Sequence, residues 1–170
     1  KGEKMKKLLV ILLALLMLVG CTSNEPTPEP TPEVSVEKLG LGSYTYFGKS
    51  TNATADEAGK TEVDTTFCLV ALDADGKITF VKFDVAQNSF TYDAAGVVTV
   101  SEDTRTKVEK KEDYNMKTYG GSVGELYEEV AALEAWCVGK TVDEVKAAAG
   151  EDGKPTDADL LAGCTIKIVD

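Results

Sequence analysis

The segment Asp73-Ala74-Asp75-Gly76 carries alternating carboxylates and a glycine, a combination that occurs inside calcium-binding loops. In such a loop the first and twelfth ligand positions would be Ala71 and Lys82, and neither side chain can bind Ca²⁺ as required. An Asp-Gly step between two strand-like stretches is instead a strong short-range signal for a β-hairpin. We therefore predict a hairpin turn at 73–76 rather than a metal site.

The chain has four cysteines and no histidine. Without histidine there are no Ser-His or Cys-His nucleophile pairs and no imidazole ligands, which argues against a hydrolase of the usual kind. Cys68, Cys137 and Cys164 follow neither a disulfide framework nor a zinc spacing. We expect buried free thiols at Cys68 and Cys137. One disulfide among the three cysteines is the open alternative.

The stretch DLLAGCT at 159–165 is the most informative part of the sequence for function. It resembles the Asp-x-x-(Ser/Thr)-Gly-Ala-Thr motif of the FMN-binding-domain family, with matches at Asp159, Gly163 and Thr165 and departures at Ala162 and Cys164. In that family a separate flavin transferase esterifies the last threonine to the FMN phosphate. The resemblance therefore implies FMN as cofactor, with the phosphoester on Thr165.

The resemblance also gives the other matching residues a role. A glycine such as Gly163 lets the backbone approach a bulky phosphate, and the carboxylate of Asp159 could position a metal or a proton during transfer. The departure at Ala162 removes a hydroxyl that could bind the phosphate. The alternative is that Thr165 is an ordinary strand residue, because a β-branched side chain fits a pleated surface.

The resemblance covers residues 40–170 loosely, through the order of a glycine-bounded aromatic strand, a hairpin and a helix. It implies an electron carrier that works with a membrane reductase. The alternative function is a non-catalytic surface module that binds a small ligand or an envelope protein without flavin. Six aromatic side chains could stack on a flavin ring or serve in core and edge packing: Tyr44, Tyr46, Phe47, Tyr114, Tyr119 and Trp136.

Hydrophobic periodicity and turn residues predict the elements that would position these groups. We expect strands first and helices next, which is an α+β fold of antiparallel hairpins, two helices and a C-terminal strand in one small domain. The strands are predicted at 42–48, 61–72, 78–85, 90–92, 97–100 and 164–169, and the helices at 123–138 and 142–149. The charged stretch 104–117 shows no persistent apolar stripe, so we predict irregular structure there.

Two capping boxes support the predicted helices. Ser122 with Glu125 would begin the first helix, and Thr141 with Glu144 would begin the second. Gly139 and Gly150 would end them.

The first residues have the pattern of a signal peptide. Lys6 and Lys7 precede the apolar run Leu8–Val19, which is too short to span a bilayer core that needs about 20 residues. The sequence Leu18-Val19-Gly20-Cys21 resembles the lipobox of bacterial lipoproteins, in which the cysteine is lipidated and becomes the mature N-terminus. We therefore expect an extracytoplasmic protein that is anchored to the membrane by lipid on Cys21.

These patterns divide the chain into three parts: a signal peptide at 1–20, a lipidated cysteine with a linker at 21–38, and an FMN-binding-like domain at 39–170. Four of the twelve residues 22–33 are prolines, which favours an extended polyproline II spacer. The abrupt end at Asp170 also makes a truncated C-terminus plausible.

Removal of residues 1–20 leaves 14 basic and 28 acidic residues, a net charge of −14. Such a surface argues against nucleic acid as a partner, because nucleic acid requires clustered lysines and arginines.

Overall fold

The computed structural model describes residues 36–168. The chain separates into two units, Lys1–Glu33 and Val34–Asp170, and the second contains every described residue. The predicted signal peptide, Cys21 and most of the predicted linker lie outside the described residues. No helix within residues 36–168 is long and apolar enough to cross a membrane.

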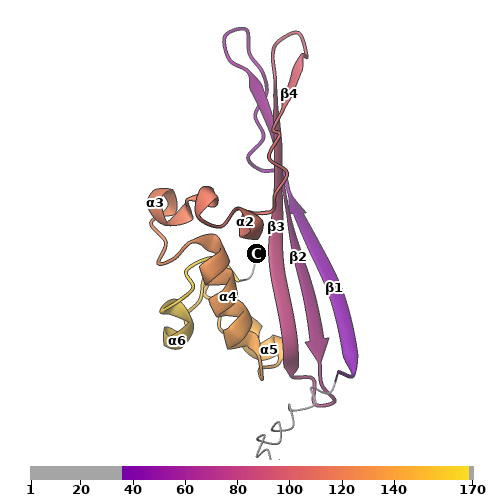
Figure 1. Ribbon diagram of the computed structural model, residues 1–170, viewed down its shortest axis with the longest axis vertical. Helices are drawn as coiled ribbons and strands as arrows, with labels where there is room; N and C mark the ends of the chain where they lie inside the picture. Colours follow the sequence, from indigo (N-terminus) through magenta and orange to yellow (C-terminus); the bar gives the residue numbers. More distant parts are fainter. Residues whose placement is uncertain (1–35, 169–170) are drawn as a thin grey trace, which may run out of the picture. The chain divides into compact units, whose positions relative to one another are not determined.

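Four antiparallel strands form one sheet in the order β1-β2-β3-β4 (Figure 1). Their bounds are β1 (Lys38–Tyr46), β2 (Gly59–Leu72), β3 (Ile78–Tyr92) and β4 (Val98–Val100). Strand β3 runs without interruption through the two segments that the sequence predicted separately. Pairing between β2 and β3 extends from Gly59 opposite Tyr92 to Leu72 opposite Ile78, so this long hairpin is the backbone of the domain.

The hairpin turn predicted at 73–76 is confirmed, and a turn of the same construction lies at 93–96, between the strand segments predicted at 90–92 and 97–100. In the first, the Asp73 carboxylate accepts hydrogen bonds from the backbone N–H groups of Asp75 and Lys77, at 3.0 and 2.8 Å. In the second, Asp93 accepts from the N–H groups of Ala95 and Val97, both at 2.9 Å. Glycines with positive φ close both turns, because a side chain would be strained there: Gly76 at +79° and Gly96 at +82°.

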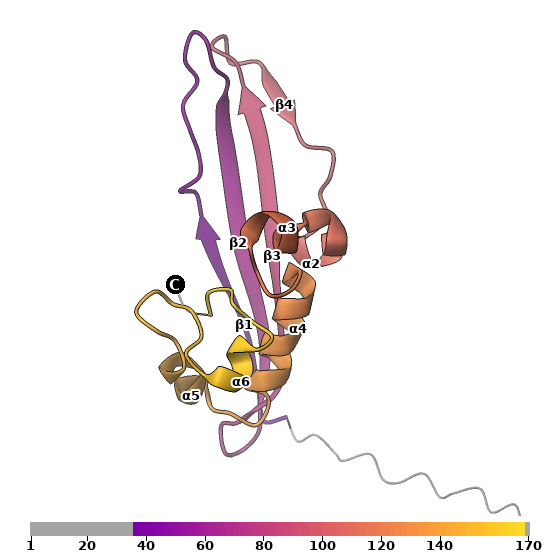
Figure 2. The ribbon, with the colours of Figure 1, turned by 90° about the vertical axis from the view of Figure 1, so that its left-hand side faces the viewer.

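The helices lie on one side of the sheet, next to β3 (Figures 1 and 2). The two longest are α4 (Leu126–Cys137) and α5 (Val142–Ala147). The shorter ones are α2 (Lys107–Lys110), the 3₁₀-helix η1 (Lys111–Tyr114), α3 (Met116–Gly120) and α6 (Ala158–Leu161). The α+β class predicted from the sequence is thereby confirmed.

The predicted capping box at Thr141 is confirmed, since its side chain accepts from the N–H of Glu144 at 3.2 Å. The box predicted at Ser122 is wrong, because α4 begins three residues later, with Glu125 at its N-cap. The Glu128 carboxylate accepts from the N–H of Glu125 at 2.9 Å. The Glu125 carboxylate also accepts from the N–H of Met116 at 2.7 Å, which ties α3 to the start of α4.

Two further predictions need correction. The stretch 104–117 is not irregular, because α2, η1 and the start of α3 lie within it. Thr106 caps α2 in a capping box with Glu109. The helices of this stretch are short and have no apolar stripe of their own.

The predicted C-terminal strand is absent from residues 164–168, while residue 169 lies outside the described residues. The N–H groups of Thr165 and Ile166 bind a side chain of α4 instead of a neighbouring strand.

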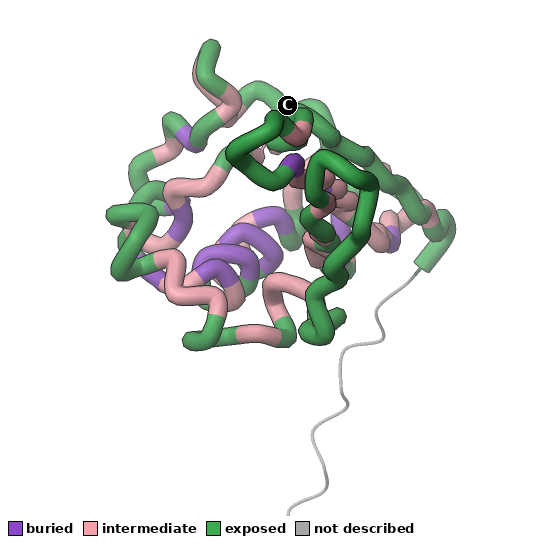
Figure 3. The backbone as a smooth tube through the Cα atoms, turned by 90° about the horizontal axis from the view of Figure 1, so that it is seen from above, coloured by how far each residue is buried: buried purple, intermediate pink, exposed green. Residues whose placement is uncertain are grey.

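The two faces of the sheet differ in what covers them, and Figure 3 shows the buried residues gathered where the helices lie. We call the face toward α4 the inner face and the opposite face the outer face. Cys68, Val70 and Leu72 of β2 pack on the inner face against a core of six buried residues. This core consists of Ile78, Val81, Leu133, Cys137, Leu160 and Cys164.

The three cysteines of the described region are free, as expected for Cys68 and Cys137, although Cys68 is only half-buried. Burial raises the pKa of the Cys137 and Cys164 thiols to about 11. Both thiols therefore stay protonated in the core, and they behave as small apolar side chains.

Candidate functional site

The side chain of Thr165 is held by a buried carboxylate of α4. Its hydroxyl lies 3.1 and 3.0 Å from the two oxygens of Glu129, and its N–H donates to Glu129 Oε2 at 2.6 Å. Ile166 and Gly124 donate two further backbone hydrogen bonds to the same carboxylate, at 3.0 and 3.2 Å. Glu129 has no solvent exposure. Several donors thus converge on one buried anion, which is how an uncompensated carboxylate is stabilised inside a protein.

The other two motif residues do not join Thr165. A Cβ atom added at Gly163 would lie 2.9 Å from the Cβ of Ala132, so the absence of a side chain here permits close packing on α4. Asp159 is exposed in the first turn of α6, where its N–H donates to the capping carboxylate of Asp157 at 3.0 Å. The structure therefore does not assemble Asp159, Gly163 and Thr165 into one phosphate-binding site. A phosphoester on Thr165 would lie against the buried carboxylate of Glu129, so these residues do not fit esterified FMN.

A cavity of about 500 Å³ lies beside Thr165, between the inner face of the sheet and α4. We call it the sheet–helix cavity. Its volume is within the range of roughly 300–1,000 Å³ that is typical of small-molecule sites. The side chains that line it are Tyr44, Thr66, Phe83, Asp84, Val85, Lys107, Leu126, Val130, Leu133, Ile166, Lys167 and Ile168.

The chemistry of this lining is apolar with two cations at its edge. The apolar and aromatic side chains come from β1, β3, α4 and the C-terminal segment. Lys107 is largely buried, lies 3.2 Å from Asp64 Oδ1 and sits 5.4 Å from the centre of the Tyr114 ring. Lys107 is paired with Asp64, and one carboxylate, Asp84, also lines the cavity. The mainly apolar lining therefore favours a ligand with an apolar body.

Glu129 and the sheet–helix cavity share one wall. Ile166 donates its N–H to Glu129, while its side chain lines the cavity together with those of Lys167 and Ile168. On α4, Val130 follows Glu129 and also lines the cavity. Glu129 consequently fixes the C-terminal segment that closes this side of the cavity.

A second, smaller cavity of about 360 Å³ lies beside the edge of β3. Glu134 of α4 binds that edge, because its carboxylate accepts from the N–H of Phe83 at 3.0 Å and pairs with Lys82. These contacts join α4 to β3 where β4 does not extend. They account for Glu134 and Lys82 of this cavity as structural contacts.

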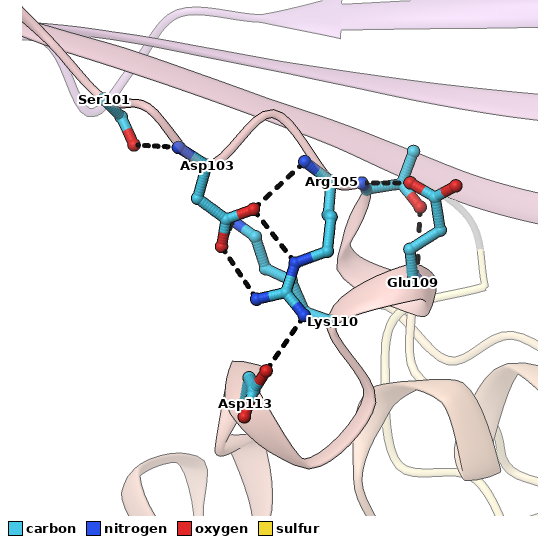
Figure 4. Close-up of polar contacts among 7 residues, drawn as sticks. Ser101, Asp103, Arg105, Glu109, Lys110 and Asp113 are labelled. Carbon is cyan, nitrogen blue, oxygen red and sulfur yellow. Dashed lines mark hydrogen bonds and ion pairs between the residues drawn. The ribbon is translucent and has the colours of Figure 1, made fainter.

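An ion cluster holds the segment that leads from β4 into α2 (Figure 4). The guanidinium of Arg105 binds both oxygens of Asp103, each at 3.0 Å, and binds Asp113 at 2.9 Å. Hydrogen bonds from Arg105 lower the pKa of Asp103 to about 2. Because Asp113 lies in η1, the cluster fixes η1 relative to the segment that follows β4.

The six aromatic residues singled out in the sequence are dispersed in the structure. Tyr44 lines the sheet–helix cavity, and Tyr114 lies beside Lys107. Trp136 packs against the core, with the Lys140 ammonium 4.2 Å from its ring centre. The remaining three are exposed, in β1, after β1 and in α3: Tyr46, Phe47 and Tyr119. Only Tyr44 is therefore placed to contact a ligand in the cavity.

Sequence reasoning missed Glu129, Lys107 and Phe83. Glu129 lies between Leu126 and Val130 on the apolar side of α4, where a glutamate is out of place on a buried helix face. That position was the signal that could have found it. Lys107 and Phe83 carry no comparable signal, since one lies in a charged stretch and the other in a strand.

No group of histidine, cysteine, aspartate or glutamate side chains within residues 36–168 is arranged to hold a metal ion. Comparison of the chain with protein-family models, with curated proteins and with solved structures gives no match.

Proposed function

We propose that this chain is a lipid-anchored extracytoplasmic protein whose domain binds a small ligand non-covalently in the sheet–helix cavity. The observation that carries the proposal is the cavity itself, about 500 Å³ with an apolar lining and two lysines. A ligand with a flat or aliphatic body fits this chemistry. The proposal makes the protein a binding module rather than a hydrolase, in line with a chain that has no histidine.

The anchoring part of the proposal rests on the sequence Leu18-Val19-Gly20-Cys21 and on the apolar run before it. Two acyl chains on one cysteine would hold the protein stably at a membrane, at ~0.8 kcal/mol for each buried CH₂. Metabolic labelling with a palmitate analogue tests this part. Label should enter the full chain, and Cys21→Ser should abolish it, whereas label retained in Cys21→Ser would refute lipidation at this residue.

Ligand binding is tested with 8-anilinonaphthalene-1-sulfonate, a fluorescent probe that joins an apolar ring system to one anionic group. Thr66 lines the cavity, while Thr65 lies on the outer face of the same strand. Thr66→Phe should fill the cavity and weaken binding at least tenfold, and Thr65→Phe should leave the affinity within about twofold. Equal affinities for wild type and Thr66→Phe would refute the sheet–helix cavity as the binding site.

FMN as a carried cofactor is the second candidate, favoured by Tyr44 and Phe83 in the cavity lining, because aromatic rings can stack on a flavin. A bound flavin would supply the redox step, and a membrane reductase would be its partner. The contacts of Thr165 with Glu129 favour non-covalent binding over a phosphoester. Co-expression with a flavin transferase separates the two forms: fluorescence that survives denaturing electrophoresis in wild type and vanishes in Thr165→Ala would show the ester.

A further inference from the structure

Strand β1 forms one edge of the sheet, and residues 39–47 lack the charges, prolines and bulges that usually keep such an edge from pairing with another chain. It pairs with β2 on one side only, and no described residue outside β2 pairs with it. Its pairing with β2 runs from Lys38 to Tyr46 without a bulge. Residues 39–47 contain no charged residue and no proline. Natural sheets usually blunt exposed edges with charges, prolines, bulges or a covering segment.

The outer face beside this edge is apolar and largely exposed, and its residues Leu41 and Phe67 also line the smaller cavity. Leu39 and Leu41 are 70% and 76% exposed, and Phe67 and Phe80 are each 42% exposed. In register, Leu41 lies opposite Leu69 of β2 and Ser43 lies opposite Phe67, so all of these side chains project from the same face. Near this edge β2 is apolar on both faces, with Phe67 and Leu69 on the outer face and Cys68 and Val70 on the inner face.

We infer that β1 pairs antiparallel with β1 of a second copy of this chain and joins the two sheets into one. The occupant of the edge must offer unpaired backbone groups, apolar side chains on the outer face and no charge. Strand β1 itself meets all three requirements, and antiparallel pairing about a two-fold axis makes the contact self-complementary. Such pairing places both outer faces on the same side, where the leucines of the two copies form one apolar surface.

The lack of charge along the edge favours this occupant, and the small contact area indicates a weak association. The acidic chains repel each other in general, yet the contact strip at 39–47 carries no charge that would have to be desolvated. A nine-residue strand is about 30 Å long and a sheet edge is about 10 Å thick, which gives ~300 Å² for each copy. A standard interface buries about 800 Å² for each partner, so we expect a reversible, concentration-dependent dimer.

A cysteine scan of the full chain tests the pairing. Leu39, Leu41, Ser43 and Thr45 are replaced by cysteine one at a time, and Phe80→Cys is the matched control on the same face at β3. Diamide accepts the two electrons and two protons that leave when two thiols form a disulfide. One β1 position, the one nearest the two-fold axis, should give a crosslinked dimer at least fivefold above the wild-type background, and Phe80→Cys should not.

Sedimentation equilibrium gives an independent measurement. Leu41→Lys should raise the dimer dissociation constant tenfold or more, since two like charges would meet near the axis, whereas Phe80→Lys should change it less than threefold. Crosslinking of Phe80→Cys equal to that of the β1 positions would overturn the edge pairing in favour of stacked outer faces. A monomer at every concentration without crosslinking would overturn the second copy as occupant and leave the edge to a strand of another protein.

Discussion

Thr165 and Glu129 are joined by both the backbone and the side chain of the threonine. The N–H of Thr165 lies 2.6 Å from Glu129 Oε2, and its hydroxyl is within 3.1 Å of both carboxylate oxygens. This pair connects the C-terminal segment to the middle of α4, and it occupies the hydroxyl that the sequence motif would assign to a phosphoester. The pair therefore links the stability of the domain to the shape of the sheet–helix cavity.

Replacing the carboxylate of Glu129 by an amide of the same shape should lower the free energy of unfolding. Glu129→Gln puts an amide NH₂ where both carboxylate oxygens now accept from backbone N–H groups, so at least one backbone N–H loses its acceptor. We expect a loss of about 2–4 kcal/mol in the free energy of unfolding. Urea unfolding measures it, with the exposed Glu151→Gln as control, which should change stability by less than about 0.5 kcal/mol. Similar losses of stability for the two variants would contradict the role of the buried Glu129 carboxylate as a hydrogen-bond acceptor.

Gly163 should be required for packing on α4 rather than for a cofactor. Gly163→Ala places a Cβ 2.9 Å from that of Ala132 and should destabilise the fold by about 1–3 kcal/mol. The double variant with Ala132→Gly removes the clash, so its loss should be smaller than the sum of the two single losses by about 1 kcal/mol or more. Strict additivity in urea unfolding would show that the two residues do not touch.

The Arg105–Asp103 pair should make the stability of the fold depend on pH in the acid range. The pKa of Asp103 is about 2 in the folded protein against an ordinary 3.8, so the folded state favours the ionised form. Its contribution is complete above about pH 4 and is lost as the pH falls toward 2. Asp103→Asn should therefore lower the urea midpoint at pH 6 but much less at pH 2.5. A constant difference between variant and wild type across this range would argue against the pair, and Asp75→Asn in the exposed first turn is the control.

The core thiols should be protected by the fold. With pKa values of about 11, Cys137 and Cys164 carry almost no thiolate at pH 8. Neither should react with Ellman's reagent in native buffer, and both should react in 6 M guanidinium chloride. Cys137→Ala and Cys164→Ala should each lower the denatured thiol count by one without changing the native count. Because the folded pKa is raised, these thiols should also make stability fall as the pH rises from about 9 to 11.

Local signals predicted the hairpins and the second helix well. The Asp-x-x-Gly turns at 73–76 and 93–96 contain their own hydrogen-bond acceptors, and Thr141 with Glu144 caps α5 through contacts within one turn. Such features depend on neighbours in the sequence, so the sequence alone can indicate them.

The errors arise where distant residues decide the local structure. The backbone at 164–168 is not a strand because Thr165 and Ile166 bind Glu129, which is 36 and 37 residues away in the sequence. The face of β2 with Val63, Phe67 and Leu69 has the clearest alternation, yet α4 packs on the other face, through Cys68 and Val70. Both faces are apolar, so periodicity alone could not identify the inner one.

The candidate site was only partly accessible to the same reasoning. A matching glycine and threonine at Gly163 and Thr165 indicated a segment next to the cavity, but each residue makes a packing or hydrogen-bonding contact with α4. The cavity itself depends on how β1, β3 and α4 assemble. No spacing in the sequence contains that information.

A nitrogen–proton NMR titration of the full chain with 8-anilinonaphthalene-1-sulfonate and, separately, with FMN locates ligand binding at single residues. At least one of these ligands should shift the amide signals of cavity residues such as Thr66, Val85 and Lys107, while the signals of outer-face residues such as Thr65 and Phe80 should stay unchanged. Shifts confined to the outer face, or no shifts with either ligand at millimolar concentration, would contradict ligand binding in the sheet–helix cavity.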